Sequence, residues 1–210
     1  MNNPGHGLHR EMRIGNSMLM IGETGDQKTG LMNRPVAFHI FVADVDATFA
    51  RAIAVGGTSM GDPEDRPYGE RSGFVRDAYG NHWYIATVTS QEAAGRAQRT
   101  VVPYLHARDV ASYMDFLARA FGAIEEERHE QAPGLIPYAR VRIGDAPIEF
   151  GTTDPMPGGY FMYVADPDAV YEQALAAGAT SLSAPADRPT GRIAFVEDPI
   201  GNHWYIARPM

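Results

Sequence analysis

The chain contains no cysteine, and its apolar runs are short. The lack of cysteine excludes disulfide bonds, zinc sites built on thiolates and a cysteine nucleophile. Apolar runs such as Ile40 to Val42 fall far short of the ~20 residues that a membrane-spanning helix needs. The N-terminus has no basic start followed by an apolar stretch, so we expect no secretory signal. Together these absences predict a cytoplasmic protein without a membrane segment.

Basic residues are also scarce, because Lys and Arg total 18 against 26 Asp and Glu, for a formal net charge of −8. Proteins that bind nucleic acid neutralise its phosphates with Lys and Arg. The sequence has no basic cluster, so we expect no nucleic-acid partner. The composition, 44% hydrophobic and 21% charged, is that of a globular protein with one large domain or two small ones.

An internal repeat dominates the sequence. The segment Gly80–Ala86, Gly-Asn-His-Trp-Tyr-Ile-Ala, recurs without change as Gly201–Ala207. Upstream, further segments match at a nearly constant offset: Val42-Ala43-Asp44 with Val164-Ala165-Asp166, Asp65-Arg66-Pro67 with Asp187-Arg188-Pro189, and Phe74-Val75 with Phe195-Val196. Matches of this length indicate a duplication.

The first copy is the shorter one. A weaker match aligns Arg13-Ile14-Gly15-Asn16 with Arg142-Ile143-Gly144-Asp145. About 40 residues of the second copy precede this point, starting near Val101, but the first copy has only 12. We therefore expect the N-terminal repeat to lack roughly its first strand and helix.

Local patterns predict the same elements in both copies. The β-rich stretch 36–42 predicts a strand, and residues 45–55 carry apolar groups at helical spacing after the N-cap candidates Asp44 and Asp46. Two more strands are expected at 73–75 and 82–88, with another short strand near Thr58. The later elements expected are strands at 101–107, 138–143, 147–150, 160–164, 194–197 and 203–207, and helices at 110–121 and 168–177.

These units resemble the βαβββ module of the vicinal oxygen chelate superfamily, which includes glyoxalases, bleomycin-resistance proteins and extradiol dioxygenases. The residues that carry the resemblance are Pro103-Tyr104-Leu105 with Asp109, Phe116 to Ala123, Arg142 to Asp145, Val164 to Asp166 with Asp168, and Asp198 to Trp204. The resemblance implies an α+β fold of tandem modules whose mixed sheets form U-shaped clefts, with the N-terminal module truncated.

The expected domains are an incomplete glyoxalase-like repeat at 1–92, a linker at 93–99 that could equally form a short helix, and a complete two-module domain at 100–210. A truncated module leaves a sheet edge that must be covered. We expect a second chain or the C-terminal repeat to cover it, and the first option predicts a homodimer. A strict monomer in light scattering would contradict that option.

The resemblance also implies where a metal would sit, because metal-using members place two neutral and two acidic ligands on the first and last strands of paired modules. The corresponding positions here are Val102, Gly159 and Tyr205, and one acid remains at Glu149. In the first repeat they are Ala37, Met20 and Tyr84. We therefore expect the usual metal tetrad to be absent from both repeats.

Side chains two apart on a strand share a face, which gives a second set of candidates. His39 and His82 would face one cleft, whereas His106, Glu149 and His203 would face the other and could form a displaced site for Zn, Ni, Fe or Mn. Structural roles compete with this interpretation. His82 and His203 could bond the adjacent turn, and Glu149 could pair with an arginine such as Arg140.

Two further repeated pairs need an explanation. Arg71 and Arg192 could clamp an anionic substrate, although surface ion pairs are the favoured interpretation. Trp83 and Trp204 have the opposite parity to the cleft residues, so we expect them to pack in the core against the helices.

Two functions remain open. The first is a glyoxalase-like lyase or isomerase acting on a small oxygen-containing molecule, with Glu149 and His106 as catalytic candidates. The second is a metal-free protein that binds or sequesters an aromatic small molecule. The expected cleft-facing aromatics Tyr104, Phe161, Tyr163 and Tyr205 favour binding, since ligand pockets are mostly apolar.

Overall fold

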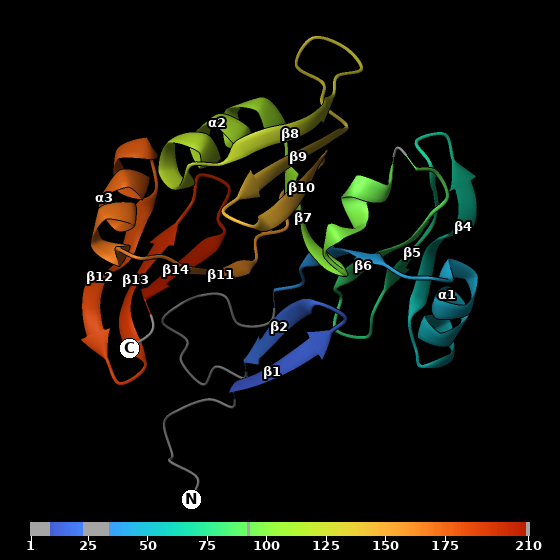
Figure 1. Ribbon diagram of the computed structural model, residues 1–210, viewed down its shortest axis with the longest axis horizontal. Coiled ribbons are helices and arrows are strands. Elements are labelled where there is room, and N and C mark those ends of the chain that lie inside the picture. Colours follow the sequence, from blue (N-terminus) through green and yellow to red (C-terminus); the bar gives the residue numbers. More distant parts are fainter. Residues whose placement is uncertain (1–8, 23–33, 92, 209–210) are drawn as a thin grey trace, which may run out of the picture. The chain divides into compact units, whose positions relative to one another are not determined.

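The computed structural model describes residues 9–22, 34–91 and 93–208, and it divides into two compact units that meet between Tyr104 and Leu105. No helix of the described residues is long and apolar enough to cross a membrane. Both units consist of runs of strands with few helices, which confirms the α+β class (Figure 1).

The first unit begins with a hairpin and continues with one complete βαβββ module. Its elements are β1 (His9–Ile14), β2 (Ser17–Gly22), β3 (Ala37–Phe41), α1 (Val45–Ala54), β4 (Thr58–Arg66), β5 (Glu70–Arg76), β6 (His82–Val88), a 3₁₀ helix (Ala93–Gln98) and the start of β7 (Val101–Ala107). The 3₁₀ helix occupies the stretch expected to be a linker or a short helix.

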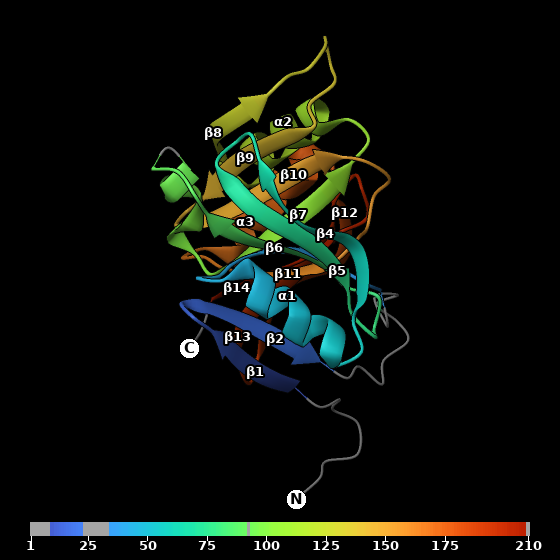
Figure 2. The same cartoon turned by 90° about the vertical axis from the view of Figure 1, so that its right-hand side faces the viewer.

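Strand β3 pairs in parallel with β6, and β6 pairs antiparallel with β5, which pairs antiparallel with β4. On its other side β3 pairs antiparallel with the first half of β7, where His39 lies opposite Val102. Helix α1 packs on β4, β5 and β6, and so covers one face of this sheet (Figure 2). The opposite face is left to the residues that share the parity of His39.

The second unit contains the rest of one module and another complete one. Its elements are the end of β7, α2 (Val110–Phe121), β8 (Ile124–His129), β9 (Tyr138–Ile143), β10 (Ala146–Thr152), β11 (Gly159–Tyr163), α3 (Pro167–Ala177), β12 (Thr180–Arg188), β13 (Gly191–Glu197) and β14 (His203–Arg208). Strand β9 lies between β8 and β10, and a separate sheet has the order β11-β14-β13-β12.

The helices begin where aspartates cap them. Asp44, Asp109 and Asp166 each accept a hydrogen bond from a backbone N–H of the first helical turn, as N-cap residues do. Helices α2 and α3 end at glycines with positive φ, Gly122 and Gly178. The apolar core of the second unit is one large cluster between these helices and the sheets, and it includes Trp204.

Strands β4 and β12 are longer than the sequence patterns predict. Each spans nine residues, and both have register shifts against the neighbouring strand. Both strands are mostly exposed and contain proline, so neither shows the apolar alternation that marks a half-buried strand. The module is therefore βαβββ, with the short strand expected near Thr58 as a full member.

Candidate functional site

The repeated Gly-Asn-His-Trp motif forms a structural clamp in each copy. In the second copy the Asp198 carboxylate accepts hydrogen bonds from the backbone N–H of Asn202, from the Asn202 side-chain amide and from the Trp204 indole. Asn202 Oδ1 accepts from the backbone N–H of Gly158, just before β11. The motif therefore ties the first strand of the module to its last strand.

The first copy repeats this clamp with Asp77, Asn81 and Trp83, and Asn81 Oδ1 accepts from Val36 N–H. Burial raises the pKa of Asp77, but the hydrogen bonds from Trp83 and Asn81 outweigh it, so the pKa lies below its usual value. The two tryptophans pack against helix-side residues, as expected from their parity.

The two histidines of the motif lie at the start of the last strand of each copy, His82 on β6 and His203 on β14. His203 is buried, and its Nε2 lies 3.1 Å from Glu197 Oε2 on the neighbouring strand β13. His82 is half-buried, and burial together with the nearby charge of Arg76 lowers its pKa. The ring of His203 therefore serves a cross-strand contact on the face that it shares with Tyr205.

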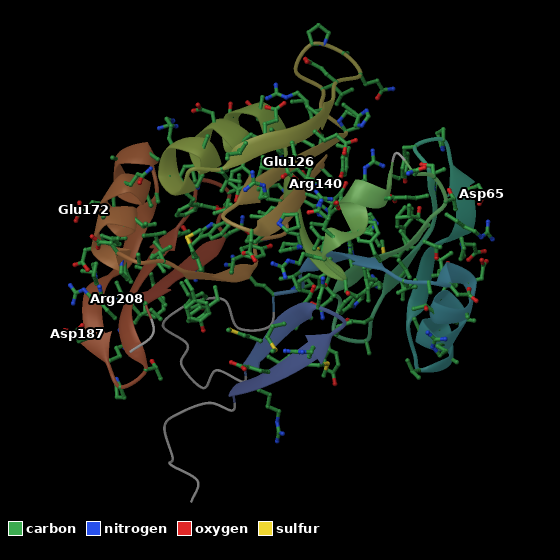
Figure 3. The ribbon with its side chains drawn as sticks, in the orientation of Figure 1. Asp65, Glu126, Arg140, Glu172, Asp187 and Arg208 are labelled. Atoms are coloured by element: carbon green, nitrogen blue, oxygen red, sulfur yellow. The ribbon has the colours of Figure 1, made fainter. Side chains whose placement is uncertain are left out.

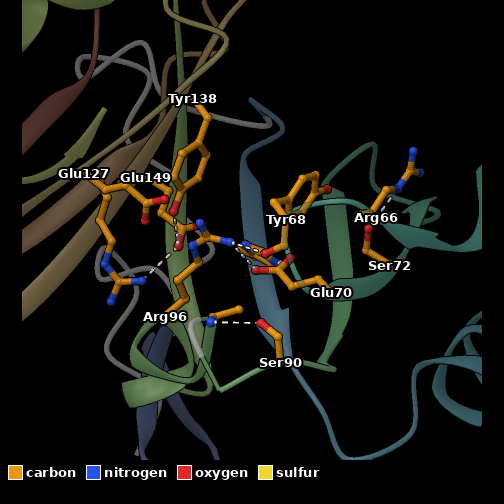
Figure 4. Close-up of polar contacts among 12 residues, drawn as sticks. Arg66, Tyr68, Glu70, Ser72, Ser90, Arg96, Glu127, Tyr138 and Glu149 are labelled. Atoms are coloured by element: carbon orange, nitrogen blue, oxygen red, sulfur yellow. Dashed lines mark hydrogen bonds and ion pairs between the residues drawn. The ribbon is translucent and has the colours of Figure 1, made fainter. Parts of the chain in front are cut away.

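A cluster of polar groups, formed by His39, Glu70 and Arg96, lies on the face of the first sheet opposite α1. His39 Nε2 lies 3.6 Å from Glu70 Oε2. Arg96 Nη1 donates to Glu70 Oε1 at 3.4 Å, and Figure 4 shows these two side chains. Glu70 is only 2% exposed and His39 7%. An imidazole beside a buried carboxylate can take up and release a proton, so this His39 cluster can perform acid–base chemistry.

Aromatic rings border the His39 cluster. Tyr84 lies 4.6 Å from Tyr104 and 5.0 Å from Phe74, measured between ring centroids. Burial raises the pKa of Tyr84, so its phenol stays protonated well above neutral pH. Tyr104, which the sequence analysis grouped with Phe161, Tyr163 and Tyr205, instead packs against Tyr84 within the first unit.

Glu149 in the second unit is fully buried and paired. Its Oε1 accepts from Arg140 Nη1 at 3.1 Å and from the Tyr138 hydroxyl at 3.2 Å. Arg140 also donates to Glu126 on β8, and Figure 3 shows these two side chains together. The Glu149 carboxylate is thus paired with Arg140, one of the two alternatives that the sequence left open. Glu149 is therefore not an isolated base.

The described residues do not assemble the metal site proposed from His106, Glu149 and His203. His106 is buried at 5% exposure on β7. Within residues 9–22, 34–91 and 93–208, no group of three or more His, Asp or Glu side chains is placed to hold a metal ion.

The last module carries an aromatic face, formed by Phe161, Tyr163, Phe195 and Tyr205 together with Arg188. The Phe161 and Tyr205 rings are stacked with centroids 5.5 Å apart and an interplanar angle of 2°. Tyr163 lies 5.3 Å from Phe161, and Phe195 meets Tyr205 edge-on at 5.0 Å. Phe161 is 41% exposed and Tyr163 59%, so this face presents ring surface to solvent.

Two members of the aromatic face were not predicted from the sequence, although the internal repeat contains a signal for both. Phe195 and Arg188 lie in repeated segments, and the Arg188 guanidinium sits 5.4 Å above the Phe195 ring. The first copy has the same pair, with Arg66 5.2 Å above Phe74. Glu70 and Arg96 were also missed, because neither belongs to a repeated motif.

Arg71 and Arg192 form surface ion pairs, which was the favoured interpretation. Arg71 bonds both carboxylate oxygens of Asp46, at 2.8 and 2.7 Å, and Arg192 bonds those of Asp168 in the same way. The hydrogen bond from each arginine lowers the pKa of its aspartate partner. Each arginine therefore pairs with an aspartate in the first turn of a helix, α1 or α3.

Comparisons with known proteins agree with this architecture. The family model of the Glyoxalase/Bleomycin resistance protein/Dioxygenase superfamily matches residues 99–206. Uncharacterized proteins of Mycobacterium bovis and Mycobacterium tuberculosis are 35% identical over 86 residues, which is 37% of this chain and 57% and 51% of those proteins. The chain thus spans about half the length of the curated relatives it matches.

Among solved structures, glyoxalase I from Zea mays has a TM-score of 0.62 at 16% identity, over 82% of this chain and 66% of the maize chain. A mutant of the same maize enzyme has a TM-score of 0.64 at 14% identity, over 95% of this chain and 82% of that one. Identities this low establish a shared fold.

Proposed function

Because the chain belongs to the Glyoxalase/Bleomycin resistance protein/Dioxygenase superfamily, we propose that it binds a planar aromatic small molecule, and that the aromatic face of the last module is the binding surface. The observation that carries this proposal is the parallel stack of Phe161 on Tyr205 beside the exposed ring of Tyr163. Rings already held parallel offer a flat ligand a surface that needs no rearrangement.

The physical chemistry of the face favours an aromatic ligand over an aliphatic one. Offset-stacked and edge-on ring pairs are worth roughly 0.5–1.5 kcal/mol beyond the area that they bury. Phe161 and Tyr163 sit two residues apart on β11 and therefore project from the same side of the sheet. A ligand ring against both would remove two large exposed apolar surfaces from water.

The polar groups at this face favour oxygen-bearing substituents on that ligand. Burial raises the pKa of Tyr205, so its hydroxyl remains a hydrogen-bond donor and acceptor at neutral pH. Arg188 is exposed and carries a permanent positive charge next to Phe195. An aromatic carboxylate or phenolate matches both groups.

A thermal-shift screen of aromatic acids and phenols against the full chain, followed by calorimetry on the hits, tests this proposal. We expect Phe161→Ala and Tyr163→Ala each to weaken binding about 5- to 20-fold, because each removes one stacking surface. Tyr79→Ala is the matched control, since Tyr79 is 87% exposed but lies in the other unit. Equal affinities for all three variants would rule out the aromatic face as the binding surface.

The His39 cluster supports a second candidate, an isomerase or lyase that moves a proton next to a carbonyl group. The specific observation is the buried imidazole 3.6 Å from a buried carboxylate. Incubation of α-hydroxy ketones with the protein in D₂O, followed by NMR, would reveal catalysed deuterium exchange. His39→Gln should abolish that exchange and Arg71→Ala should retain it; exchange that survives His39→Gln would remove this candidate.

A further inference from the structure

The two copies of the Asp-Asn-Trp clamp have the same internal hydrogen bonds, but they differ in how deeply they are buried. In the second copy Asp198, Asn202 and Trp204 are 4%, 1% and 3% exposed. Their counterparts in the first copy, Asp77, Asn81 and Trp83, are only half-buried. Because the clamps themselves match bond for bond, the difference lies in what packs over them.

Helix α2 is the cover in the second copy. The Tyr113 hydroxyl donates to Asp198 Oδ2 at 2.6 Å and accepts from the Asn202 amide at 3.0 Å. The Phe121 ring lies 4.7 Å from the Trp204 ring. At the far end, the Arg119 guanidinium bonds the carbonyl of Ala177, the last residue of α3. One helix thus contacts the clamp, the indole and the end of the neighbouring helix.

The first copy has a hollow where its counterpart of α2 would lie. The hollow has a volume of about 340 Å³ and is lined by Ala52, Val55, Asp77, Tyr79, Trp83 and Ile85, among others. Its lining comes from α1 and from strands of the sheet that α1 covers. Helix α1 is the only α-helix among the described residues of this unit.

The lining of the hollow corresponds, through the repeat, to residues of α3 and of the sheet beside it, and α2 packs against α3 in the second copy. Ala52 and Val55 correspond to Ala174 and Ala177 of α3 at the offset of the repeat. Val55 is 85% exposed, and Ile53 beside it is 36% exposed, although both are apolar. The hollow thus places apolar side chains of α1 and of the sheet around the Asp77 carboxylate.

We propose that this hollow is the docking site for an amphipathic helix of a different protein, which presents a tyrosine hydroxyl to Asp77 and an aromatic ring to Trp83. The occupant follows from the second copy, where Tyr113 and Phe121 fill the equivalent positions from a single helix. These residues are eight apart, about 12 Å along a helix axis, and the partner helix carries the same spacing. A second copy of this chain cannot supply it, because its own α2 is held by Asp198 and Trp204.

A synthetic peptide with the sequence of residues 109–123 is the probe, because it carries Tyr113 and Phe121 at the required spacing. The chain has two tryptophans, so the full-length ¹⁵N-labelled protein gives two indole N–H signals, assigned with Trp83→Phe. Titration with the peptide should shift the Trp83 signal and leave the Trp204 signal in place. A peptide with Tyr113→Phe should bind about tenfold more weakly, because a hydrogen bond to the Asp77 carboxylate is lost.

Two matched variants on α1 locate the peptide. Thr48 lines the hollow, whereas Ala50 is exposed elsewhere on the same helix. Thr48→Phe should fill part of the hollow and weaken peptide binding at least fivefold, and Ala50→Phe should leave it unchanged. An unshifted Trp83 signal, a shift of Trp204 alone, or equal affinity for both peptides would each overturn the proposal.

Discussion

At the scale of single residues, the equivalent aspartates Asp77 and Asp198 have different surroundings in the two copies. Asp77 and Asp198 both bond the backbone and side-chain amide of an asparagine and the indole of a tryptophan. Of the two, only Asp198 also accepts from a tyrosine hydroxyl, that of Tyr113, and only Asp198 is buried away from water. Buried donors that lose their acceptor cannot turn to solvent instead.

Replacing the two aspartates should therefore have unequal costs. Asp198→Ala removes the carboxylate acceptor from buried donors of Asn202, Trp204 and Tyr113, and we expect the free energy of unfolding to fall by about 3 kcal/mol or more. Asp77→Ala should cost roughly 1 kcal/mol, because water reaches the half-buried donors. Urea unfolding followed by circular dichroism measures both values, and equal losses would show that burial does not set the cost.

At the scale of elements, the helices depend on their N-terminal aspartates. Asp109 accepts from both the backbone N–H and the hydroxyl of Ser112, and these bonds lower the pKa of its carboxyl group. A carboxyl with a lowered pKa stabilises the fold above its unfolded pKa of about 3.9. That contribution is lost as the pH falls through the folded pKa.

Asp109→Asn separates capping from charge. Asparagine is as good an N-cap as aspartate but does not titrate, so the variant should lose less stability than the wild type as the pH falls from about 4 to about 2. Asp115→Asn is the control, because Asp115 forms an exposed pair with Arg119 on the same helix. Parallel stability profiles for Asp109→Asn and the wild type would contradict a role for the Asp109 charge.

The elements also show where sequence patterns are sufficient. Repetition and the spacing of apolar residues predict β3, α1, β6 and their counterparts, because these segments recur in both copies. Side-chain parity likewise predicts that Phe161 and Tyr205 share a face, which their stacked rings confirm. The sequence patterns predict β4 and β12 to be shorter than they are, because both strands are polar and irregular. The patterns also miss Glu70, because a one-residue deletion in the repeat alignment lies beside it, just after Arg66-Pro67.

At the scale of the whole molecule, the two units differ in the size of their apolar cores. The second unit buries one large cluster that includes Phe150, Leu117 and Ile206. Among its described residues, the first unit buries two clusters of three residues each, one around Val102 and one around Val75. Buried apolar area sets much of the free energy of opening, so the first unit should open more readily.

Hydrogen exchange followed by mass spectrometry tests this difference. Amides in β5 and β6 should exchange faster than those in the equivalent strands β13 and β14, because the hydrogen-bond ladders match and only the packing differs. The comparison is internally controlled, since both peptide sets come from one sample. Equal protection would mean that cluster size does not govern opening in this protein.

The unequal cover of the two indoles also gives the chain a pair of built-in optical reporters. Each repeat holds one of the two tryptophans, and one ring is 3% exposed while the other is half-buried. Excited indole emits at longer wavelength where water can relax around it, so a single emission spectrum carries a blue component from Trp204 and a red component from Trp83. Quenching by a small solute would then distinguish events at the two repeats in the native chain without any attached dye.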